Sequence, residues 1–283
     1  PDSVDIDIHE DIALLQYTGG TTGIPKGAML THANIVANCE QSFAWFPDTK
    51  PGEEKMVGVL PFFHVFAMTA VMNMSVRAGM EIVALPRFDL NQTLKLIDKH
   101  KPTYFPAVPA IYTAINNHPK RDEYDLSSIK YCVSGGAPLP VEVKKQFEET
   151  TGCTLVEGYG LTESAPVVCV NPTHNTPRAG CIGLPVPHTI VEILSTEDGE
   201  TVQKTGERGE LCVTGPQVMK GYWNRAEETA NVLKNGRLHT GDVAIMHEDG
   251  MVEIVDRIKD LILTNGYNVY PRHVEEAIYT HPA

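Results

Sequence analysis

Short apolar runs alternate with helix-like segments through residue 172, and this alternation restricts the chain to few folds. Six runs have the length and residue types of buried strands: ALLQYT, MVGVL, EIVAL, TYFPAV, YCVSG and TLVEG. Segments with helical periodicity follow most of them. The first covers residues 31–45, where Thr31 can cap a helix. Its predicted apolar face consists of Ile35, Val36, Cys39 and Phe43. The pattern predicts an α/β fold, a parallel sheet with flanking helices.

The pattern changes after Gly180, where strands with period-two stretches replace the alternation. Asp198-Gly199 and Asp249-Gly250 are hairpin-turn signals, so we expect a small antiparallel, barrel-like β subdomain. Past Asp256 we expect one more short strand, a turn at Gly266 and the first residues of a helix. We predict three parts: 1–179, the α/β part of a large domain lacking its N-terminal portion; 180–256, the β subdomain; and 257–283, a hinge and the truncated start of a C-terminal α+β domain.

Charge and cysteine spacing exclude several classes of protein. The formal net charge is −13, so nucleic acid has little electrostatic attraction for the chain. An anionic substrate would need local cations or a metal ion. The six cysteines include no CxxC pair, which argues against a zinc or thioredoxin motif and favours buried reduced thiols in the cytoplasm. Residues 56–76 lack charges, but Pro61 and polar residues divide them, so we expect a buried strand, a turn and a buried helix rather than a membrane span.

Residues 18–27 combine glycines, threonines and one lysine in a pattern that indicates phosphate binding. The spacing fits neither a Walker A motif nor a Rossmann GxGxxG motif. The backbone N–H groups of a glycine-rich loop can nonetheless form an anion-binding nest. Threonine hydroxyls would add hydrogen-bond donors to it, and Lys26 would add positive charge. Two other loops, SGGAP and GYGLTE, also end predicted strands, where ligands of parallel sheets bind.

Six motifs occur in a fixed order: YTGGTTGIPKGAMLTH, SGGAPL, VEGYGLTES, GELCVTGPQVMKGYWN, LHTGDVA and VDRIKDLILTNGYNVYP. Together they resemble the adenylate-forming superfamily, which contains acyl-CoA synthetases, luciferases and peptide-synthetase adenylation domains. The resemblance covers almost the whole chain. Gly19 and the segments VEGYGLTES and GLPVP are most similar to the sequences of medium- and long-chain fatty-acid–CoA ligases.

The resemblance implies a role for each matching residue. The loop for the β- and γ-phosphates would consist of Thr18, Gly19, Gly20, Thr21, Thr22, Gly23 and Lys26. The adenine side would be formed by Gly135, Gly136, Ala137 and Tyr159, with Gly158 and Gly160 leaving the ring of Tyr159 uncovered. Thr162 would contact the α-phosphate, and Glu163 would be the magnesium ligand. Asp242 would accept from the ribose hydroxyls, and Arg257 would contact the ribose and the α-phosphate. Lys259 would be the hinge, and Gly266 would approach CoA.

His64 has two interpretations: a packed core histidine, or a residue that borders the carboxylate and acyl pocket, as one does in this family. The neighbouring apolar side chains could line an acyl tunnel or belong to the core: Phe62, Phe63, Val65 and Met68. We count Lys26, His64, Thr162 and Glu163 as the catalytic candidates.

The implied function is ATP-dependent activation of a fatty acid to an acyl-adenylate and transfer to CoA, with ATP, Mg²⁺ and CoA required. The family's catalytic lysine would lie beyond residue 283, so we expect this chain to be a fragment that binds adenine nucleotide and is almost inactive. The alternatives are an adenylate-forming enzyme with another carboxylate or acceptor, and a nucleotide-binding module without catalysis. We expect no transmembrane segment, while contact with the inner face of the membrane and homo-oligomerisation stay open.

Overall fold

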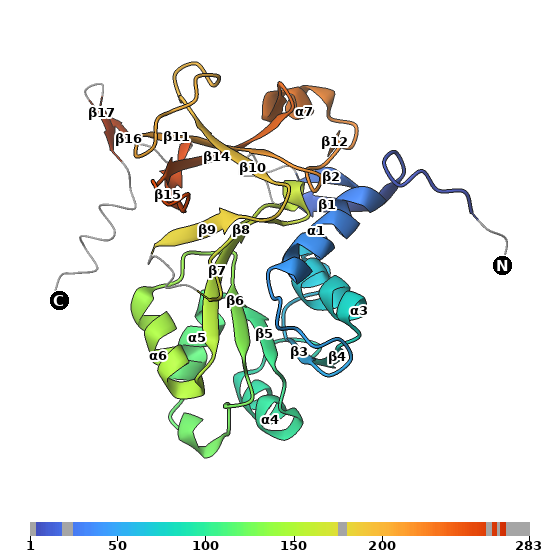
Figure 1. The fold of residues 1–283 in the computed structure, drawn as a ribbon, viewed down its shortest axis with the longest axis vertical. Coiled ribbons are helices and arrows are strands. Elements are labelled where there is room, and N and C mark those ends of the chain that lie inside the picture. Colours follow the sequence, from blue (N-terminus) through green and yellow to red (C-terminus); the bar gives the residue numbers. More distant parts are fainter. Residues whose placement is uncertain (1–3, 19–24, 175–179, 259–261, 265–266, 270–283) are drawn as a thin grey trace.

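The computed structural model describes residues 4–18, 25–174, 180–258, 262–264 and 267–269 (Figure 1). One long sheet runs through most of it, in the strand order β10-β11-β14-β15-β9-β8-β7-β6-β5-β3-β4, with β13 beside β14. Its lower part is parallel and contains β4 (Glu81–Ala84), β3 (Lys55–Gly58), β5 (Tyr104–Ala107), β6 (Tyr131–Ser134) and β7 (Thr154–Gly160). The predicted α/β parallel sheet is therefore confirmed for five of the six runs.

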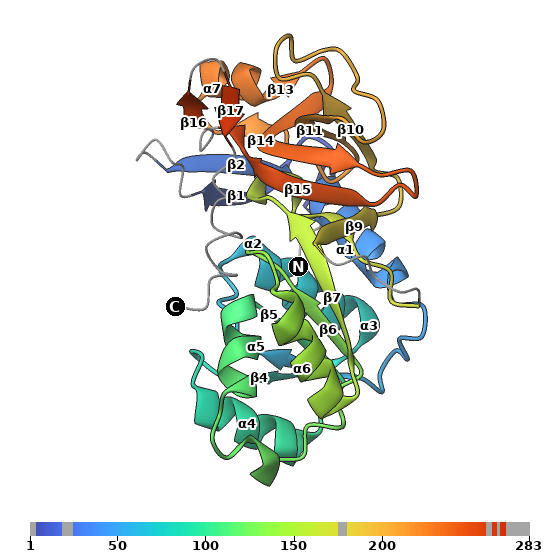
Figure 2. The same cartoon turned by 90° about the vertical axis from the view of Figure 1, so that its left-hand side faces the viewer.

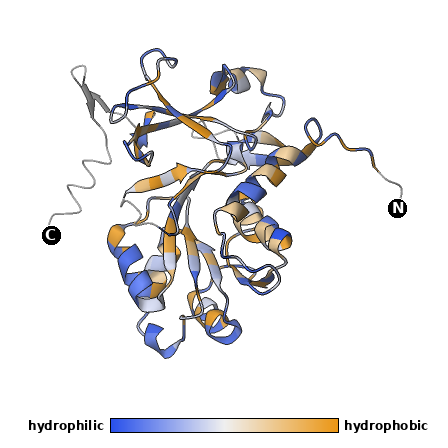
Figure 3. Ribbon diagram, viewed as in Figure 1, coloured by the Kyte–Doolittle hydropathy of each residue, from blue (hydrophilic) through white to orange (hydrophobic). Residues whose placement is uncertain are grey.

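Helices cover both faces of the parallel strands (Figure 2). One face packs against α4 (Leu90–His100), α5 (Pro109–Asn116) and α6 (Val141–Thr151), with the short η2 (Arg121–Glu123) beside them. The other packs against α1 (His32–Ala44) and against α2 (Val65–Ala67), η1 (Met68–Asn73) and α3 (Met74–Ala78), which follow one another directly. Figure 3 shows α6 as mostly hydrophilic, and its buried side chains are Phe147 and Thr151. The strand, turn and helix predicted for residues 56–76 are present.

The upper part of the sheet is antiparallel, as predicted for the strands after Gly180; β8, which precedes them, was not predicted. It contains β8 (Val167–Val170), β9 (Cys181–Pro185), β10 (Ile190–Leu194), β11 (Arg208–Thr214), β13 (Leu233–Lys234), β14 (Arg237–Met246) and β15 (Val252–Arg257). The turns at Asp198-Gly199 and Asp249-Gly250 also form, and both glycines have positive φ. The two kinds of strand form one hydrogen-bonded sheet, because β8 pairs with β7 on one side and with β9 on the other. The domain boundary at residue 180 stays a prediction.

The ALLQYT strand does not join the parallel sheet, which corrects that expectation. It forms β1 (Ile12–Thr18), which pairs antiparallel with β2 (Lys26–Thr31), and β12 (Gly221–Tyr222) completes a separate three-stranded sheet. A parallel crossover needs a dozen or more residues, whereas only residues 19–25 connect β1 to β2. This small sheet and the antiparallel strands enclose a shared core that includes Leu30, Leu211, Val213 and Tyr222.

Helix α1 begins at the predicted cap, and its buried face includes polar residues that were not predicted. The Thr31 hydroxyl accepts from the Asn34 amide at 3.2 Å, and the Asn34 side chain accepts from the Thr31 amide at 2.9 Å. Cys39 is buried, but Val36 is 60% exposed. The other buried positions of α1 are polar: Asn38, Gln41 and Ser42. The predicted apolar face is therefore wrong at Val36.

The remaining elements are η3 (Thr162–Ser164), α7 (Ala226–Val232), β16 (Ile262–Thr264) and β17 (Tyr267–Val269). The strand predicted after Asp256 is present as β16, which pairs with β17, whereas the turn glycine Gly266 and the predicted last helix lie outside the described residues. All six cysteines are buried and none forms a disulfide, as expected. Among the helices described, none has the length and apolar character that crossing a bilayer requires.

Candidate active site

A pocket of about 690 Å³ lies where the parallel strands meet the upper sheet. Its lining includes most of the described candidate residues: Thr18, His64, Gly135, Gly136, Ala137, Gly158, Tyr159, Gly160, Thr162, Glu163, Asp242 and Arg257. They come from β1, the segment before α2, the loop after β6, the end of β7, η3, β14 and β15. Positions far apart in the sequence thus meet at one place, at the carboxyl ends of β6 and β7. Gly19, Gly20, Thr21, Thr22, Gly23, Lys259 and Gly266 lie outside the described residues.

Two of these glycines have identifiable backbone reasons. Gly136 has φ +83°, a left-handed conformation that a glycine adopts without strain, in the loop after β6. A Cβ on Gly160 would lie 2.1 Å from the carbonyl oxygen of Pro166. Gly160 therefore permits a close approach of two backbone segments, a structural reason independent of any ligand.

Tyr159, Asp242 and Arg257 form one hydrogen-bonded group in the pocket. The Tyr159 hydroxyl donates to Asp242 Oδ2 at 2.5 Å, and Arg257 Nε lies 3.3 Å from Asp242 Oδ1. Asp242 and Arg257 are direct partners across the β14–β15 ladder. Asp242 is only 6% exposed, and this burial raises its pKa, although Tyr159 and Arg257 oppose the shift. A carboxylate accepts about four hydrogen bonds, so Asp242 retains capacity for further donors such as ribose hydroxyls.

Glu210 anchors the irregular stretch of β14 that presents Asp242, a role that the sequence did not predict. Glu210 Oε1 accepts from the Gly241 amide at 2.9 Å, and Oε2 lies 2.8 Å from His239 Nδ1. The Thr240 hydroxyl donates to the Leu211 carbonyl at 2.7 Å, which fixes the same stretch of β14 to β11. The sequence did contain a signal for this contact. Glu210 belongs to the motif GELCVTG and His239 to the motif LHTGDVA.

Tyr222 contacts two of the candidate residues, Lys26 and Glu163, and was not predicted. Its hydroxyl donates to Glu163 Oε1 at 2.6 Å, and Lys26 Nζ lies 4.6 Å from its ring centroid, within cation–π range. Lys26 does not line the pocket itself, but β12 pairs with β2 and so brings Tyr222 beside it. Burial raises the pKa of Tyr222, and the Glu163 carboxylate raises it further, so the phenol keeps its proton.

Glu163 has a chemistry that fits Mg²⁺. In the described part of the chain no protein group bonds its second carboxylate oxygen, Oε2. Mg²⁺ prefers hard oxygen ligands, and it commonly takes one or two carboxylates and fills its other positions with water and substrate phosphates. Glu163 and the nearby Thr162 both face the pocket, so a metal held by Glu163 would adjoin any phosphate bound there.

His64 is exposed and lines the pocket, so its interpretation as a packed core residue is wrong. It caps α2, because its Nδ1 accepts from the Phe66 amide at 3.2 Å. Of the four apolar neighbours proposed for a tunnel, only Val65 is among the lining residues. Phe63 is 81% exposed, and Met68 is buried in the core.

The rest of the pocket is largely apolar and was not predicted. Its lining includes Trp45, Phe46, Met56, Phe66, Ala70, Met74, Tyr104, Val133 and Val170. These residues lie on α2, η1, α3 and the strands β3, β5, β6 and β8, or follow the end of α1. Phe46 and Tyr104 pack edge to face, with ring centroids 5.7 Å apart. The same pocket therefore has polar loops suited to a nucleotide and an apolar region suited to a hydrocarbon.

A pocket at the carboxyl edge of a parallel sheet, with a buried carboxylate beside an aromatic ring and a cation, has the make-up of a nucleotide-binding enzyme. The chain belongs to the AMP-binding enzyme family, whose model matches residues 2–223. The resemblance inferred from the motifs is thereby confirmed.

Proteins of known name and structure are similar to the chain over almost its whole length. The chain is 57% identical over 278 residues to the long-chain-fatty-acid–CoA ligase of Bacillus subtilis, covering 98% of this chain and 50% of that protein. It matches the crystal structure of ATP-bound MatB from Rhodopseudomonas palustris with a TM-score of 0.90 and 30% identity, covering 99% of this chain and 55% of that one. It matches O-succinylbenzoate coenzyme A synthetase (MenE) from Bacillus subtilis, in complex with ATP and magnesium ion, with a TM-score of 0.86 and 30% identity, covering 100% and 58%. The chain thus spans about half the length of the relatives it matches.

Proposed function

We propose that the full-length protein is an AMP-forming fatty-acid–CoA ligase. The observation that carries this proposal is the single pocket in which Asp242, Tyr159 and Glu163 adjoin an apolar lining. Sequence similarity supports it, because a relative with 57% identity has the name long-chain-fatty-acid–CoA ligase. The substrates are then a fatty acid, ATP and CoA.

The nucleotide would occupy the polar part of the pocket. Asp242 would accept from the ribose hydroxyls, and Tyr159, held by its bond to Asp242, would lie against the adenine together with Gly135 and Ala137. Glu210 would keep Asp242 in place through the Gly241 amide. The loop of residues 18–23 and Lys26 would hold the outer phosphates.

The first reaction joins two anions, so the residues around the phosphates must offset their repulsion. An oxygen of the fatty-acid carboxylate forms a bond to the α-phosphorus of ATP, the bond from that phosphorus to the β-phosphate oxygen breaks, and pyrophosphate leaves. Lys26 and Arg257 would supply positive charge, while Thr162 would donate to the α-phosphate. When bound at Glu163, Mg²⁺ supplies further positive charge to the phosphate oxygens. His64 would border the fatty-acid carboxylate.

The second reaction transfers the acyl group. A CoA thiolate attacks the acyl carbon, the bond to the AMP oxygen breaks, and AMP leaves as a phosphate monoester. Lys259 and Gly266 are proposed for the hinge and for the approach of CoA. Because the six described cysteines are buried and form no disulfide, we also propose a cytoplasmic location, with the inner face of the membrane as the place where the enzyme meets fatty acid.

Glu163→Gln in the full-length protein tests this proposal. Removing the magnesium carboxylate should lower ATP–pyrophosphate exchange with a long-chain acid by about 10²–10³-fold, because a ligand for charge in the transition state is lost. Binding of the acid should change little. Glu142→Gln, at an exposed position of α6, is the matched control and should keep full exchange.

Product analysis separates the remaining alternatives. Wild type incubated with ATP, Mg²⁺, CoA and a long-chain acid should yield the acyl-CoA thioester and AMP. Exchange without thioester would indicate another acceptor, and nucleotide binding without exchange would indicate a binding module. Near-normal ATP–pyrophosphate exchange by the Glu163→Gln variant would contradict the assignment of Glu163 as the magnesium ligand.

A further inference from the structure

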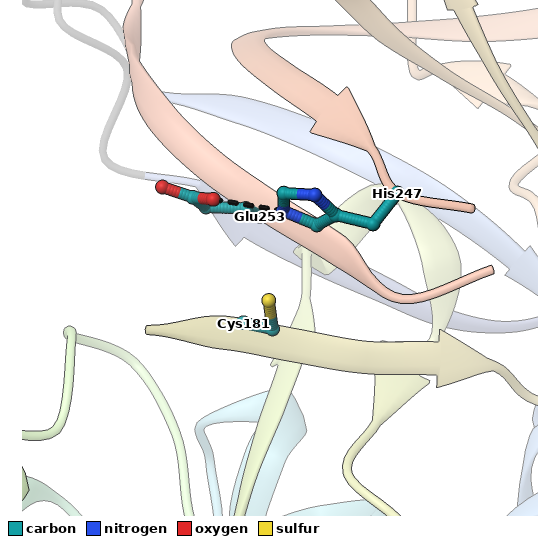
Figure 4. A group of neighbouring side chains, drawn as sticks. All are labelled: Cys181, His247 and Glu253. Carbon is teal, nitrogen blue, oxygen red and sulfur yellow. Dashed lines mark hydrogen bonds and ion pairs between the residues drawn. The ribbon is translucent and has the colours of Figure 1, made fainter. Parts of the chain in front are cut away.

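Three side chains that metals bind meet where β9, β14 and β15 join, away from the residues discussed so far. They are Cys181, His247 and Glu253, and Figure 4 shows the Cys181 sulfur pointing from β9 toward the hairpin that carries the other two. One donor atom from each lies within 4.8 Å of the others. The residues are 66 and 6 positions apart in the sequence (181 to 247, and 247 to 253), so no local motif predicted them.

Backbone hydrogen bonds hold the three positions in place. Cys181 and Glu253 are direct partners across the β9–β15 ladder. His247 follows the last residue of β14, its amide donates to the Met251 carbonyl at 2.9 Å, and its carbonyl accepts from the Gly250 amide at 3.0 Å. A tight hairpin therefore fixes the separation of His247 from Glu253, and the cluster is built on strands rather than on a long loop.

The side chains offer a buried anchor and an open entrance. Cys181 is fully buried, while His247 and Glu253 have side chains that are 17% and 41% exposed. His247 Nε2 lies 2.9 Å from Glu253 Oε2, so the carboxylate already orients the imidazole. An ion could therefore enter from solvent at Glu253 and reach the sulfur.

We propose that Cys181, His247 and Glu253 bind Zn²⁺, with water as the fourth ligand. Thiolate, imidazole and carboxylate are the usual zinc ligands, and at bond lengths of about 2.0–2.3 Å the edges of a tetrahedral site measure about 3.4–3.6 Å. The donor atoms need to move only modestly to reach these separations. On binding, Cys181 releases its thiol proton to solvent. The His247 ring proton that bonds Glu253 leaves Nε2 for solvent while Nδ1 takes one up, so the Nε2 lone pair becomes available to the ion. Two anionic ligands then balance the charge of the ion, which limits the penalty of placing it in a partly buried site.

A second cluster also consists of a cysteine, a histidine and a glutamate, but its side chains hold the backbone in place instead of offering a metal site. Glu210, Cys212 and His239 also lie within 4.8 Å, but both Glu210 oxygens are already used by the Gly241 amide and by His239. Burial raises the pKa of Cys212 to about 12, which keeps the thiol protonated. These residues hold the stretch of β14 that carries Asp242, so we expect no ion there, and Cys212 serves as an internal control.

The zinc site would be distinct from the nucleotide pocket. Ile254 lines that pocket, and side chains alternate between the faces of a strand, so its neighbour Glu253 projects from the opposite face of β15. Cys181 is the direct partner of Glu253 across the ladder, so its side chain lies on the same face as that of Glu253. This proposal does not depend on the proposed ligase activity.

Equilibrium dialysis of the full-length protein against Zn²⁺, with Mg²⁺ in excess, tests the site. We expect one tightly bound Zn²⁺ per chain. Glu253→Gln should weaken Zn²⁺ binding at least about 10-fold, and Cys181→Ser at least about 100-fold. Loss of a residue that only hydrogen-bonds to a metal ligand typically costs about 10–100-fold in affinity, and loss of the ligand itself should cost more. Cys212→Ser should leave the affinity unchanged.

Co²⁺ provides an independent readout of the sulfur ligand. Co²⁺ added to wild type should give a thiolate-to-cobalt charge-transfer band that Cys181→Ser removes and Cys212→Ser keeps. Glu253 is at the surface, so Glu253→Gln should fold normally, which circular dichroism can check. Wild-type affinity in Glu253→Gln and His247→Gln, or a band that survives Cys181→Ser, would overturn the proposal.

Discussion

Tyr222 contacts two candidate residues at once, since its ring faces the Lys26 ammonium and its hydroxyl donates to the Glu163 carboxylate. The hydroxyl fixes the orientation of a carboxylate that we propose as the magnesium ligand. Partners behind a metal ligand commonly contribute 10–100-fold to affinity or activity. Tyr222 is thus a positioning residue, because it acts through Glu163 rather than on the substrate.

Tyr222→Phe separates these two contacts, because it removes the hydroxyl and keeps the ring beside Lys26. We expect about a 10-fold lower kcat and a shift of the Mg²⁺ dependence to higher concentration, with a stability loss of only about 1 kcal/mol. Magnesium titration of acyl-CoA synthesis by the full-length protein measures this. Tyr124→Phe, in the distant lower part, is the control. An unchanged Mg²⁺ dependence would contradict the positioning role.

Asp242→Asn tests the buried carboxylate by its effect on stability. Burial raises the pKa of Asp242, so the folded state binds this proton more tightly than the unfolded state does. The ionised carboxylate therefore destabilises the fold at neutral pH, and the wild type gains stability relative to the variant as the pH falls through the raised pKa. We expect Asp242→Asn to be at least as stable as wild type at pH 7, with a margin that shrinks in acid.

Thermal unfolding of both proteins at several pH values measures this margin. The same variant should bind ATP less tightly, and should discriminate less between ATP and 2′,3′-dideoxy-ATP, because the carboxylate that accepts from the ribose is gone. A stability margin that grows as the pH falls would mean that the pKa of Asp242 is lowered instead.

At the scale of the element, α1 explains why one sequence prediction failed. Asn38 is fully buried; its Oδ1 accepts from the Val167 amide at 2.9 Å and its Nδ2 donates to the Val167 carbonyl at 2.8 Å. Gln41 donates to the Pro187 carbonyl at 2.7 Å. Polar side chains of α1 thus satisfy backbone groups of β8 and of the segment after β9, and hydrophobic periodicity cannot reveal such a face.

Asn38→Ala should therefore destabilise the protein more than a change at the predicted apolar face. It leaves the Val167 amide without its side-chain acceptor in a buried place, which typically costs about 1–3 kcal/mol. Val36→Ala, at a 60% exposed position, should change stability by less than about 0.5 kcal/mol. Thermal or denaturant unfolding of the full-length protein compares them. Equal effects would show that the polar face contributes little.

Strands were predicted well because runs such as MVGVL and YCVSG combine β-branched residues with turn signals, and they form β3 and β6. Their partners were harder to predict. A run like ALLQYT carries no information on which sheet it joins, and the short link to the unpredicted β2 decided it.

At the scale of the whole molecule, the sheet brings together loops that the motifs had named separately. All the described candidate residues except Lys26 line one pocket, so the motif order was sufficient to identify most of it. Tyr222, Glu210 and the apolar lining were missed because their roles depend on contacts between distant strands, such as β12 with β2. The Cys181 cluster was missed for the same reason, since spacing rules register only local cysteine motifs.

Ala70→Phe measures most directly whether one pocket holds both nucleotide and acyl chain. Ala70 lies on η1 and lines the apolar region, so a phenyl ring there should occupy space needed by the chain. Overpacking of this kind typically lowers the free energy of unfolding by about 1–3 kcal/mol. Circular dichroism and an unchanged KM for ATP would show that the variant is still folded. In the full-length protein, kcat/KM for long-chain acids should fall at least about 10-fold relative to short-chain acids. An equal loss for acids of every length, or a KM for ATP that rises in parallel, would contradict an acyl chain in this region.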